Sequence, residues 1–118
     1  MMKQLVLVGA VMVGLAAAPV FAADDTFVSK VAKGGMAEVE LGKLAAEKGS
    51  SDAVKKFGQR MADDHGKAND ELKTLASSKG VQVPAETDKS HKKKADELNK
   101  KPADKFDHEY MELMVKEH

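Results

Sequence analysis

The segment from Ser51 to Gly80 carries the strongest structural signal in this sequence and constrains the fold more than any other stretch. Its apolar positions recur every three or four residues, which places them on one face of a helix that turns about 100° per residue. Ser50 or Ser51 can cap the start of this helix, and Gly80 is typical of its end. The stripe consists of Val54, Phe57, Met61, His65, Ala68, Leu72 and Leu75. The sequence therefore predicts a long amphipathic helix against which the rest of the chain packs.

A second helical pattern precedes this segment and runs to about Lys48. It opens with the capping cluster Asp24-Asp25-Thr26. Gly34-Gly35 inside it costs about 1 kcal/mol per glycine relative to alanine, which indicates a close helix approach or a bend. The turn at Gly49-Ser50-Ser51 is very short, so we expect the two helices to form an antiparallel hairpin. The inner face of the first helix comprises Phe27, Val31, Gly34, Glu38, Leu41 and Ala45.

The remainder of the chain predicts a short helix and then a longer one. Pro84 fixes an extended entry into a polar connector, in which a helix of two or three turns starts at Thr87 or Asp88. The run of lysines at 92–94 is typical of a solvated face, with contact to an anionic lipid or another polyanion as the alternative. Pro102 begins the last helix, whose inner face comprises Phe106, Tyr110, Leu113 or Met114, and Glu117 or His118. The pattern as a whole predicts an all-α antiparallel helical bundle over residues 23–118.

The first 22 residues are predicted to be a secretory signal peptide. Lys3 gives a positive start, residues 5–18 form an apolar core, and Val20-Phe21-Ala22 resembles a signal peptidase site. The apolar run is too short for a convincing membrane anchor. We therefore expect cleavage after Ala22 and export to the periplasm or the outer membrane, with peripheral association with the outer membrane as one outcome.

Composition excludes several classes of function. Without Lys3 the chain has 18 basic and 19 acidic side chains, a balance that argues against nucleic-acid binding. No cysteine is present, so neither a disulfide framework nor an N-terminal lipid-modified cysteine can form. No Ser-His-Asp set, glycine-rich phosphate loop or zinc-ligand spacing stands out. Hydrolase and nucleotide chemistry therefore have no support in the sequence.

Polar residues inside the apolar stripes are the candidate functional residues. Carboxylates and imidazoles that project inward from facing helices are the ligands from which metal sites in helical bundles are built, and they suit iron or manganese, while zinc can also bind them. The Glu-x-x-His pattern of di-iron bundles is absent, and only Asp88-x-x-His91 in the connector approximates it. The candidate metal ligands are Glu38, His65, Asp107 and His118.

Two other interpretations of these residues remain open. Glu38 and His65 can form a structural hydrogen-bonded pair that sets the register of the hairpin. Asp107 can cap the last helix or bond near Tyr110, and His118 can belong to a frayed helix end. The sulfur atoms of Met61, Met111 and Met114 are compatible with copper, although methionine at helical spacing more often fills a core. We expect His91 and His108 to be exposed.

Counting from the hairpin turn predicts where Glu38 and His65 lie relative to each other. Glu38 is 11 residues before Gly49 and His65 is 16 residues after it, an offset of five residues. At about 1.5 Å per residue this offset corresponds to roughly 7 to 8 Å along the helix axis. Long side chains, a water molecule or a metal ion can close that gap, so we expect the two residues to face each other.

Four segments resemble a known family in their order and spacing: AEVELGKLAAEKGS, VKKFGQRMADDHGKANDELKTLA, the VP that follows it, and FDHEYMELMVKEH. They are similar to the domain-of-unknown-function 4142 family of exported bacterial proteins, some described as predicted outer-membrane proteins. The resemblance implies a ferritin-like helical bundle, but little about activity, because the family has no agreed biochemistry. It also implies one more helix beyond the end of this chain, with its own histidine.

These observations lead to two hypotheses of function. The first is a non-catalytic envelope protein that acts through its surface or through self-association, for instance in stress tolerance. The second is a metal-binding or redox protein that uses the four candidate ligands. Because the last apolar stripe is still in phase at His118, we also expect an incomplete bundle with an open apolar groove, which a second copy can fill to give a homodimer.

Overall fold

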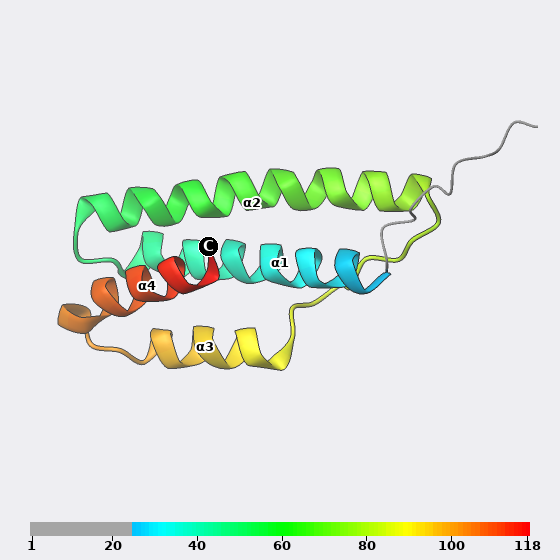
Figure 1. Cartoon of the computed structure of the whole chain (residues 1–118). Coiled ribbons are helices and arrows are strands. Elements are labelled where there is room, and N and C mark those ends of the chain that lie inside the picture. Colours follow the sequence, from blue (N-terminus) through cyan, green and yellow to red (C-terminus); the bar gives the residue numbers. More distant parts are fainter. Residues whose placement is uncertain (1–24) are drawn as a thin grey trace, which may run out of the picture.

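The computed structural model describes residues 25–118, apart from the side chain of Asp25. The predicted signal peptide lies outside the described residues. Four helices and no strand occur within the described range, so the predicted all-α bundle is confirmed (Figure 1). The helices are α1 (Asp25–Lys48), α2 (Asp52–Ser78), α3 (Lys89–Asn99) and α4 (Ala103–Glu117). None of these helices is long and apolar enough to cross a membrane.

The helix ends lie where the capping residues predict them. The side chain of Ser51 accepts a hydrogen bond from the backbone N–H of Val54, 3.1 Å away, and so caps the start of α2. Gly80 ends the same helix with a positive φ of 70°, and the N–H of Val81 donates to the carbonyl of Ala76 at 2.9 Å. This is the hydrogen bond that closes a Schellman motif, which satisfies carbonyls at a helix end. Asp88 caps α3, as the connector sequence predicts.

The hairpin of α1 and α2 is held together at very close range by two glycines. A Cβ atom added to Gly42 would lie 2.5 Å from the carbonyl oxygen of Gly58, and one added to Gly58 would lie 2.6 Å from the carbonyl oxygen of Gly42. The two backbones can approach this closely only because neither residue carries a side chain. The predicted close approach at Gly34-Gly35 is correct only for Gly35, which packs against the side chain of Asn69, whereas a Cβ at Gly34 meets no atom within 4 Å.

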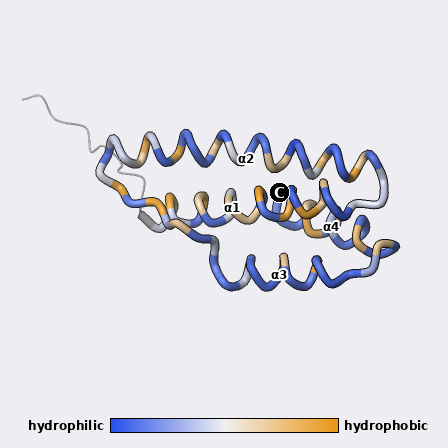
Figure 2. Tube along the Cα trace, turned by 180° about the vertical axis from the view of Figure 1, so that it is seen from behind, coloured by the Kyte–Doolittle hydropathy of each residue, from blue (hydrophilic) through white to orange (hydrophobic). Residues whose placement is uncertain are grey.

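Helices α3 and α4 cover one side of the hairpin around its turn. Two hydrogen bonds fix α3 alongside α1: the Thr87 hydroxyl donates to the Lys33 carbonyl at 2.7 Å, and the Lys48 ammonium donates to the Asn99 carbonyl at 2.9 Å. Helix α4 then runs back along α1 and ends beside its middle (Figure 1). Figure 2 shows hydrophobic positions gathered where α1 and α4 face each other, and mostly hydrophilic positions on α3.

The core lies between these elements and is built around two stacked aromatic rings. The rings of Phe106 and Tyr110 stack with centroids 6.1 Å apart, and Phe57 of α2 meets Tyr110 edge-on at 6.2 Å. Offset and edge-on arrangements of this kind are the favourable ones for aromatic pairs. The buried members of the core are Leu41, Ala45, Ala95, Leu98, Phe106, Tyr110 and Met114.

Parts of the two predicted apolar faces, on α1 and on α2, are exposed, so the expectation that these faces are buried throughout is wrong. Phe27 is 61% exposed, Val31 is 44% exposed and Leu75 is 56% exposed. The physical reason is that α4 covers only part of this side of the hairpin. Because α4 ends beside the middle of α1, no helix of the described chain lies over the same face of the hairpin beyond that level (Figure 1).

Candidate metal centre

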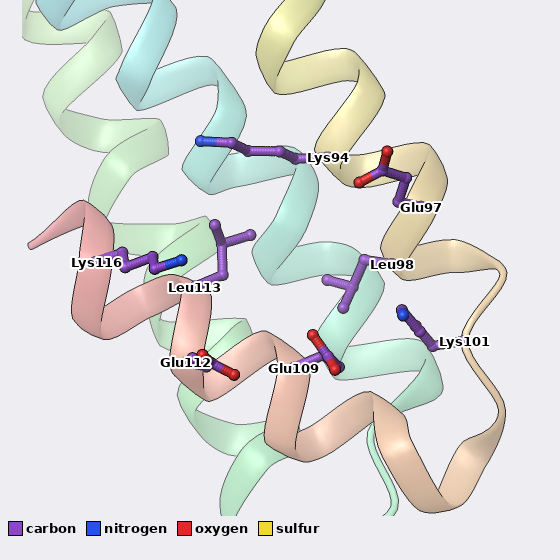
Figure 3. A pocket seen from close by; sticks show the side chains of 8 residues that line it. All are labelled: Lys94, Glu97, Leu98, Lys101, Glu109, Glu112, Leu113 and Lys116. Carbon is purple, nitrogen blue, oxygen red and sulfur yellow. The ribbon is translucent and has the colours of Figure 1, made fainter.

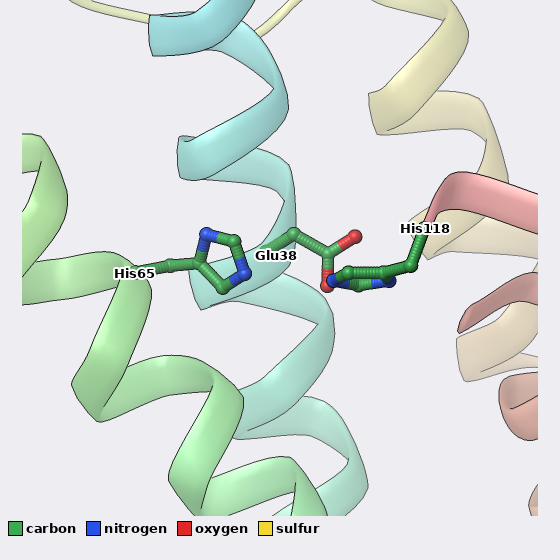
Figure 4. Close-up of side chains that lie close together, drawn as sticks. All are labelled: Glu38, His65 and His118. Atoms are coloured by element: carbon green, nitrogen blue, oxygen red, sulfur yellow. The ribbon is translucent and has the colours of Figure 1, made fainter. Parts of the chain in front are cut away.

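Glu38, His65 and His118 converge on one point in the bundle (Figure 4). Glu38 comes from α1 and His65 from α2, while His118 follows the last residue of α4. One ligand atom from each side chain lies within 4.8 Å of the other two. The expected proximity of Glu38 and His65 across the hairpin is thereby confirmed. Ligands of one transition-metal ion, at about 2.1 Å from the metal, are separated by roughly 3 to 4 Å, so a slight closure of these side chains brings them into coordination range.

The hydrogen bonding of His118 leaves one ring nitrogen free to act as a ligand. Its Nδ1 lies 2.9 Å from the carbonyl oxygen of Met114, which can only accept a hydrogen bond. Nδ1 therefore carries a proton and donates, and in the neutral ring the lone pair lies on Nε2. Metal-bound histidines commonly donate their second ring nitrogen to a carbonyl in this way.

The carboxyl group of Glu38 is buried without a hydrogen-bond partner. Glu38 is only 6% exposed, and its Oε2 finds no partner among the described residues. Burial raises the pKa of this carboxyl above its ordinary value, and the neighbouring rings of His118 and His65 only partly offset the effect. Burial also raises the pKa of Tyr110, whose hydroxyl likewise lacks a partner, and the charge of Glu38 adds to this shift. A cation at the meeting point would satisfy the Glu38 carboxylate.

A chain of polar contacts ties the last turn of α4 to α3 beside this point. Asp88 accepts from the backbone N–H of His91 at 2.9 Å and lies 2.8 Å from its Nδ1. The other ring nitrogen of His91 lies 3.8 Å from Glu117, which also accepts from the Lys94 ammonium at 2.8 Å. The hydrogen bond from Lys94 lowers the pKa of Glu117, directly before His118. These contacts hold the chain end at which His118 lies.

Tyr110 and Glu117 were placed on the inner face of the last helix but were not predicted to lie beside the candidate ligands. His91, expected to be exposed, has a side chain that is 20% exposed and half-buried. The Asp88-x-x-His91 spacing is the one signal that pointed to it. His108, in contrast, is exposed as expected.

Asp107, the fourth predicted ligand, lies apart from this group and caps a helix instead. Its two carboxylate oxygens accept from the backbone N–H groups of Ser50 and Ser51, at 2.8 and 2.9 Å. Burial alone would raise the pKa of Asp107, but these two hydrogen bonds outweigh it and leave the pKa below its ordinary value. The carboxylate thus satisfies unpaired donors at the start of α2 and pins α4 to the hairpin turn.

Replacing Asp107 with asparagine is expected to lower the free energy of unfolding at pH 7 by about 1 kcal/mol, the usual net contribution of one hydrogen bond, because the amide keeps only one of the two accepting oxygens. Because the pKa of Asp107 is lowered on folding, its contribution is complete above the pKa of an unfolded aspartate, about 3.9, and is lost as the pH falls through the folded-state value. Urea denaturation at pH 7 and pH 3 checks this, with exposed Asp96→Asn as the control. If the substitution lowers the free energy of unfolding equally at both pH values, the assignment of Asp107 as an ionised cap is wrong.

The methionines and lysines singled out in the sequence have structural roles. Met61 and Met111 pack against the core that contains Met114, which favours the core-filling interpretation over a copper site. In the lysine run, Lys92 pairs with Glu86 at 2.9 Å and Lys94 pairs with Glu117. The run is therefore an ion-paired, solvated face.

A groove between α3 and α4 is the other concave feature of this region (Figure 3). Figure 3 shows Leu98 and Leu113 between the two helices with charged side chains around them. Three lysines and three glutamates balance each other, so the groove presents no field of one sign. The charged lining residues are Lys94, Glu97, Lys101, Glu109, Glu112 and Lys116.

Carboxylates and imidazoles that project toward one another from neighbouring helices are the ligands from which metal sites in helical bundles are built. Here only Glu38 is buried, while His65 is half-buried and His118 is exposed. The sequence assigns the chain to a family: the model of the family described as Domain of unknown function (DUF4142) matches residues 11–118. The chain belongs to this family, as the resemblance of its motifs predicts. No curated protein and no solved structure matches the chain significantly.

Proposed function

We propose that this protein is an exported helical bundle of the cell envelope that binds one divalent transition-metal ion through Glu38, His65 and His118. The convergence of the three ligand atoms, with the buried Glu38 carboxylate otherwise unpaired, carries the proposal. Burial of a carboxylate without a partner is costly, and a bound cation removes that cost.

The donor set favours iron or manganese. Two histidines and one carboxylate form the ligand set of non-haem Fe(II) sites, and carboxylate oxygens also suit manganese. Zinc is the main competitor, because catalytic zinc sites also use two histidines and one glutamate. In each case three protein ligands leave at least one coordination position for a small molecule. The proposal covers metal binding and assigns no reaction to the bound ion.

Metal analysis of protein isolated from the envelope fraction tests the proposal. Native mass spectrometry and elemental analysis are expected to find one transition-metal ion per chain, lost on incubation with a chelator. Adding Fe(II), Mn(II) or Zn(II) to the metal-free protein is expected to raise its melting temperature, since a ligand that binds only the folded state stabilises it. If no metal is retained and none raises the melting temperature, the three residues form only a structural polar network.

Export is expected to remove residues 1–22, because Lys3, the apolar run and Ala22 make up a signal peptide. N-terminal sequencing of protein from the periplasm or the outer membrane should then begin at Ala23-Asp24-Asp25. A variant with Ala22 changed to a bulky residue should accumulate in the uncleaved form. Full-length protein that remains in the cytoplasm of cells with the unaltered chain would contradict the localisation.

The exposed apolar side chains favour self-association as a second candidate function. The side of the hairpin that α4 covers near the turn continues away from the turn with exposed Phe27, Val31 and Leu75. A second copy packed against this side would remove these side chains from water. Sedimentation over a range of concentrations is expected to reveal a dimer, and Phe27→Ser with Leu75→Ser to shift it to monomer. A monomer at all concentrations that binds no hydrophobic dye would show that this face needs no partner.

A further inference from the structure

The last turn of α4 brings His118 to the other two ligands, although the core does not hold this turn. Met114 is the last residue of α4 with a buried side chain, and residues 115–118 are exposed. The backbone N–H and the Nδ1 of His118 both contact the Met114 carbonyl oxygen, at 3.1 and 2.9 Å. These two contacts fix the ring relative to its own helix, but they do not fix the end of α4 relative to Glu38 on α1.

Helix α3 holds the end of α4 from the side. The Lys94 ammonium donates to the Glu117 carboxylate at 2.8 Å, and Nε2 of His91 lies 3.8 Å from the other oxygen of the same group. Figure 3 shows the Lys94 side chain reaching out from α3 toward the last turn of α4. Because Glu117 directly precedes His118, a contact that holds Glu117 also limits the positions that the His118 ring can take.

Helix α3 is in turn fixed to the helix that carries Glu38. Hydrogen bonds to the Lys33 carbonyl and from the Lys48 ammonium pin its two ends to α1. Lys33 lies five residues before Glu38, about 7 to 8 Å along the helix axis. Ala95, the residue after Lys94, is buried in the core. A continuous set of contacts through α3 therefore joins the helix of Glu38 to the end of α4.

We propose that Lys94 is a positioning residue of the metal site. By holding Glu117, it keeps His118 at the distance from Glu38 at which both side chains bind one metal ion. This inference rests on the proposed metal site, and it adds a residue that sets the affinity of that site from α3, the helix that supplies none of its three ligands.

The positive charge of Lys94 allows the sign of one measurement to test this role. An ammonium group near a bound cation repels it, so an effect of charge alone predicts that Lys94→Met strengthens metal binding. Loss of positioning predicts weaker binding, because the end of α4 must then be ordered when the metal binds. The Lys94 and Glu117 side chains are 41% and 27% exposed, and an ion pair of this kind contributes up to about fivefold to an equilibrium.

Titration of the metal-free full chain with Co(II), followed by its visible spectrum, measures the affinity of each variant. Lys94→Met is expected to bind Co(II) about three- to fivefold more weakly than wild type. Lys94→Arg keeps a charged donor for Glu117 and should bind within about twofold of wild type. The spectrum at saturation should be the same in all three proteins, since their ligands are the same. In a Glu117→Met background Lys94→Met should no longer weaken binding, because Lys94 acts through Glu117.

Lys93→Met is the matched control, because this neighbouring lysine of α3 lies 3.9 Å from Glu97 of the same helix. The substitution removes the same charge without releasing α4, so it should not weaken Co(II) binding. If Lys94→Met binds Co(II) as tightly as wild type or more tightly, or if Lys93→Met weakens binding equally, the inference is wrong and the metal site stands. If the wild type binds no Co(II), the proposed metal site fails, and the inference fails with it.

Discussion

His65→Ala is expected to lower metal affinity at least about 100-fold, equivalent to roughly 2.7 kcal/mol of binding free energy. The variant leaves two of the three candidate ligands, Glu38 and His118, and two ligands hold a transition-metal ion far less tightly than three. A competition titration against a chromophoric chelator measures this directly. His65 is half-buried and packs in no aromatic stack of the core, so the variant should still fold.

His108→Ala is the matched control, because this histidine is exposed on α4, is not among the three converging residues, and has its Nε2 3.6 Å from a Glu112 carboxylate oxygen. Its metal affinity should equal that of wild type. The two interpretations of the Glu38, His65 and His118 cluster then separate clearly. A structural network predicts a lower melting temperature for metal-free His65→Ala and no metal binding by either protein. Unchanged metal affinity in His65→Ala would remove this residue from the site.

Gly58→Ala is expected to destabilise the protein by about 1–3 kcal/mol, the usual cost of overpacking a tight interface. The new methyl group would lie 2.6 Å from the Cβ of Ala45 and 2.6 Å from the carbonyl oxygen of Gly42. The carbonyl is a backbone atom, so α1 and α2 must move apart to admit it. For a chain of this size the loss corresponds to a fall in melting temperature of about 4–8 °C per kcal/mol.

Gly34→Ala, in contrast, is expected to stabilise the protein. A methyl group there meets no atom within 4 Å, and alanine in a helix interior is favoured over glycine by about 1 kcal/mol. Urea denaturation of both variants and wild type measures the difference. Equal effects at the two positions would show that helix propensity, rather than the contact between Gly42 and Gly58, sets the stability of the hairpin.

The local features of this protein follow from its sequence. The capping residues Ser51 and Asp88 predicted the starts of α2 and α3, because their side chains satisfy N–H groups that the helix itself leaves unpaired. Counting residues from the turn predicted that Glu38 and His65 face each other, since a short turn fixes the register of two helices. Such features depend only on residues that are close together in the sequence, or on the fixed rise per residue of an α-helix.

Only the tertiary structure decides which parts of the apolar helix faces are covered and which residues distant in the sequence meet. The face of α1 that contains Phe27 and the face of α2 that contains Leu75 are true helical faces, but both of these residues are exposed. Periodicity carries no information about where a neighbouring helix ends. Asp107 lies on the last helix at a position that suits a ligand, yet it caps the start of α2, because packing of α4 brings it to Ser50 and Ser51. His118 reaches Glu38 for the same reason: the path of α4 along α1 brings this exposed residue beside the buried carboxyl group.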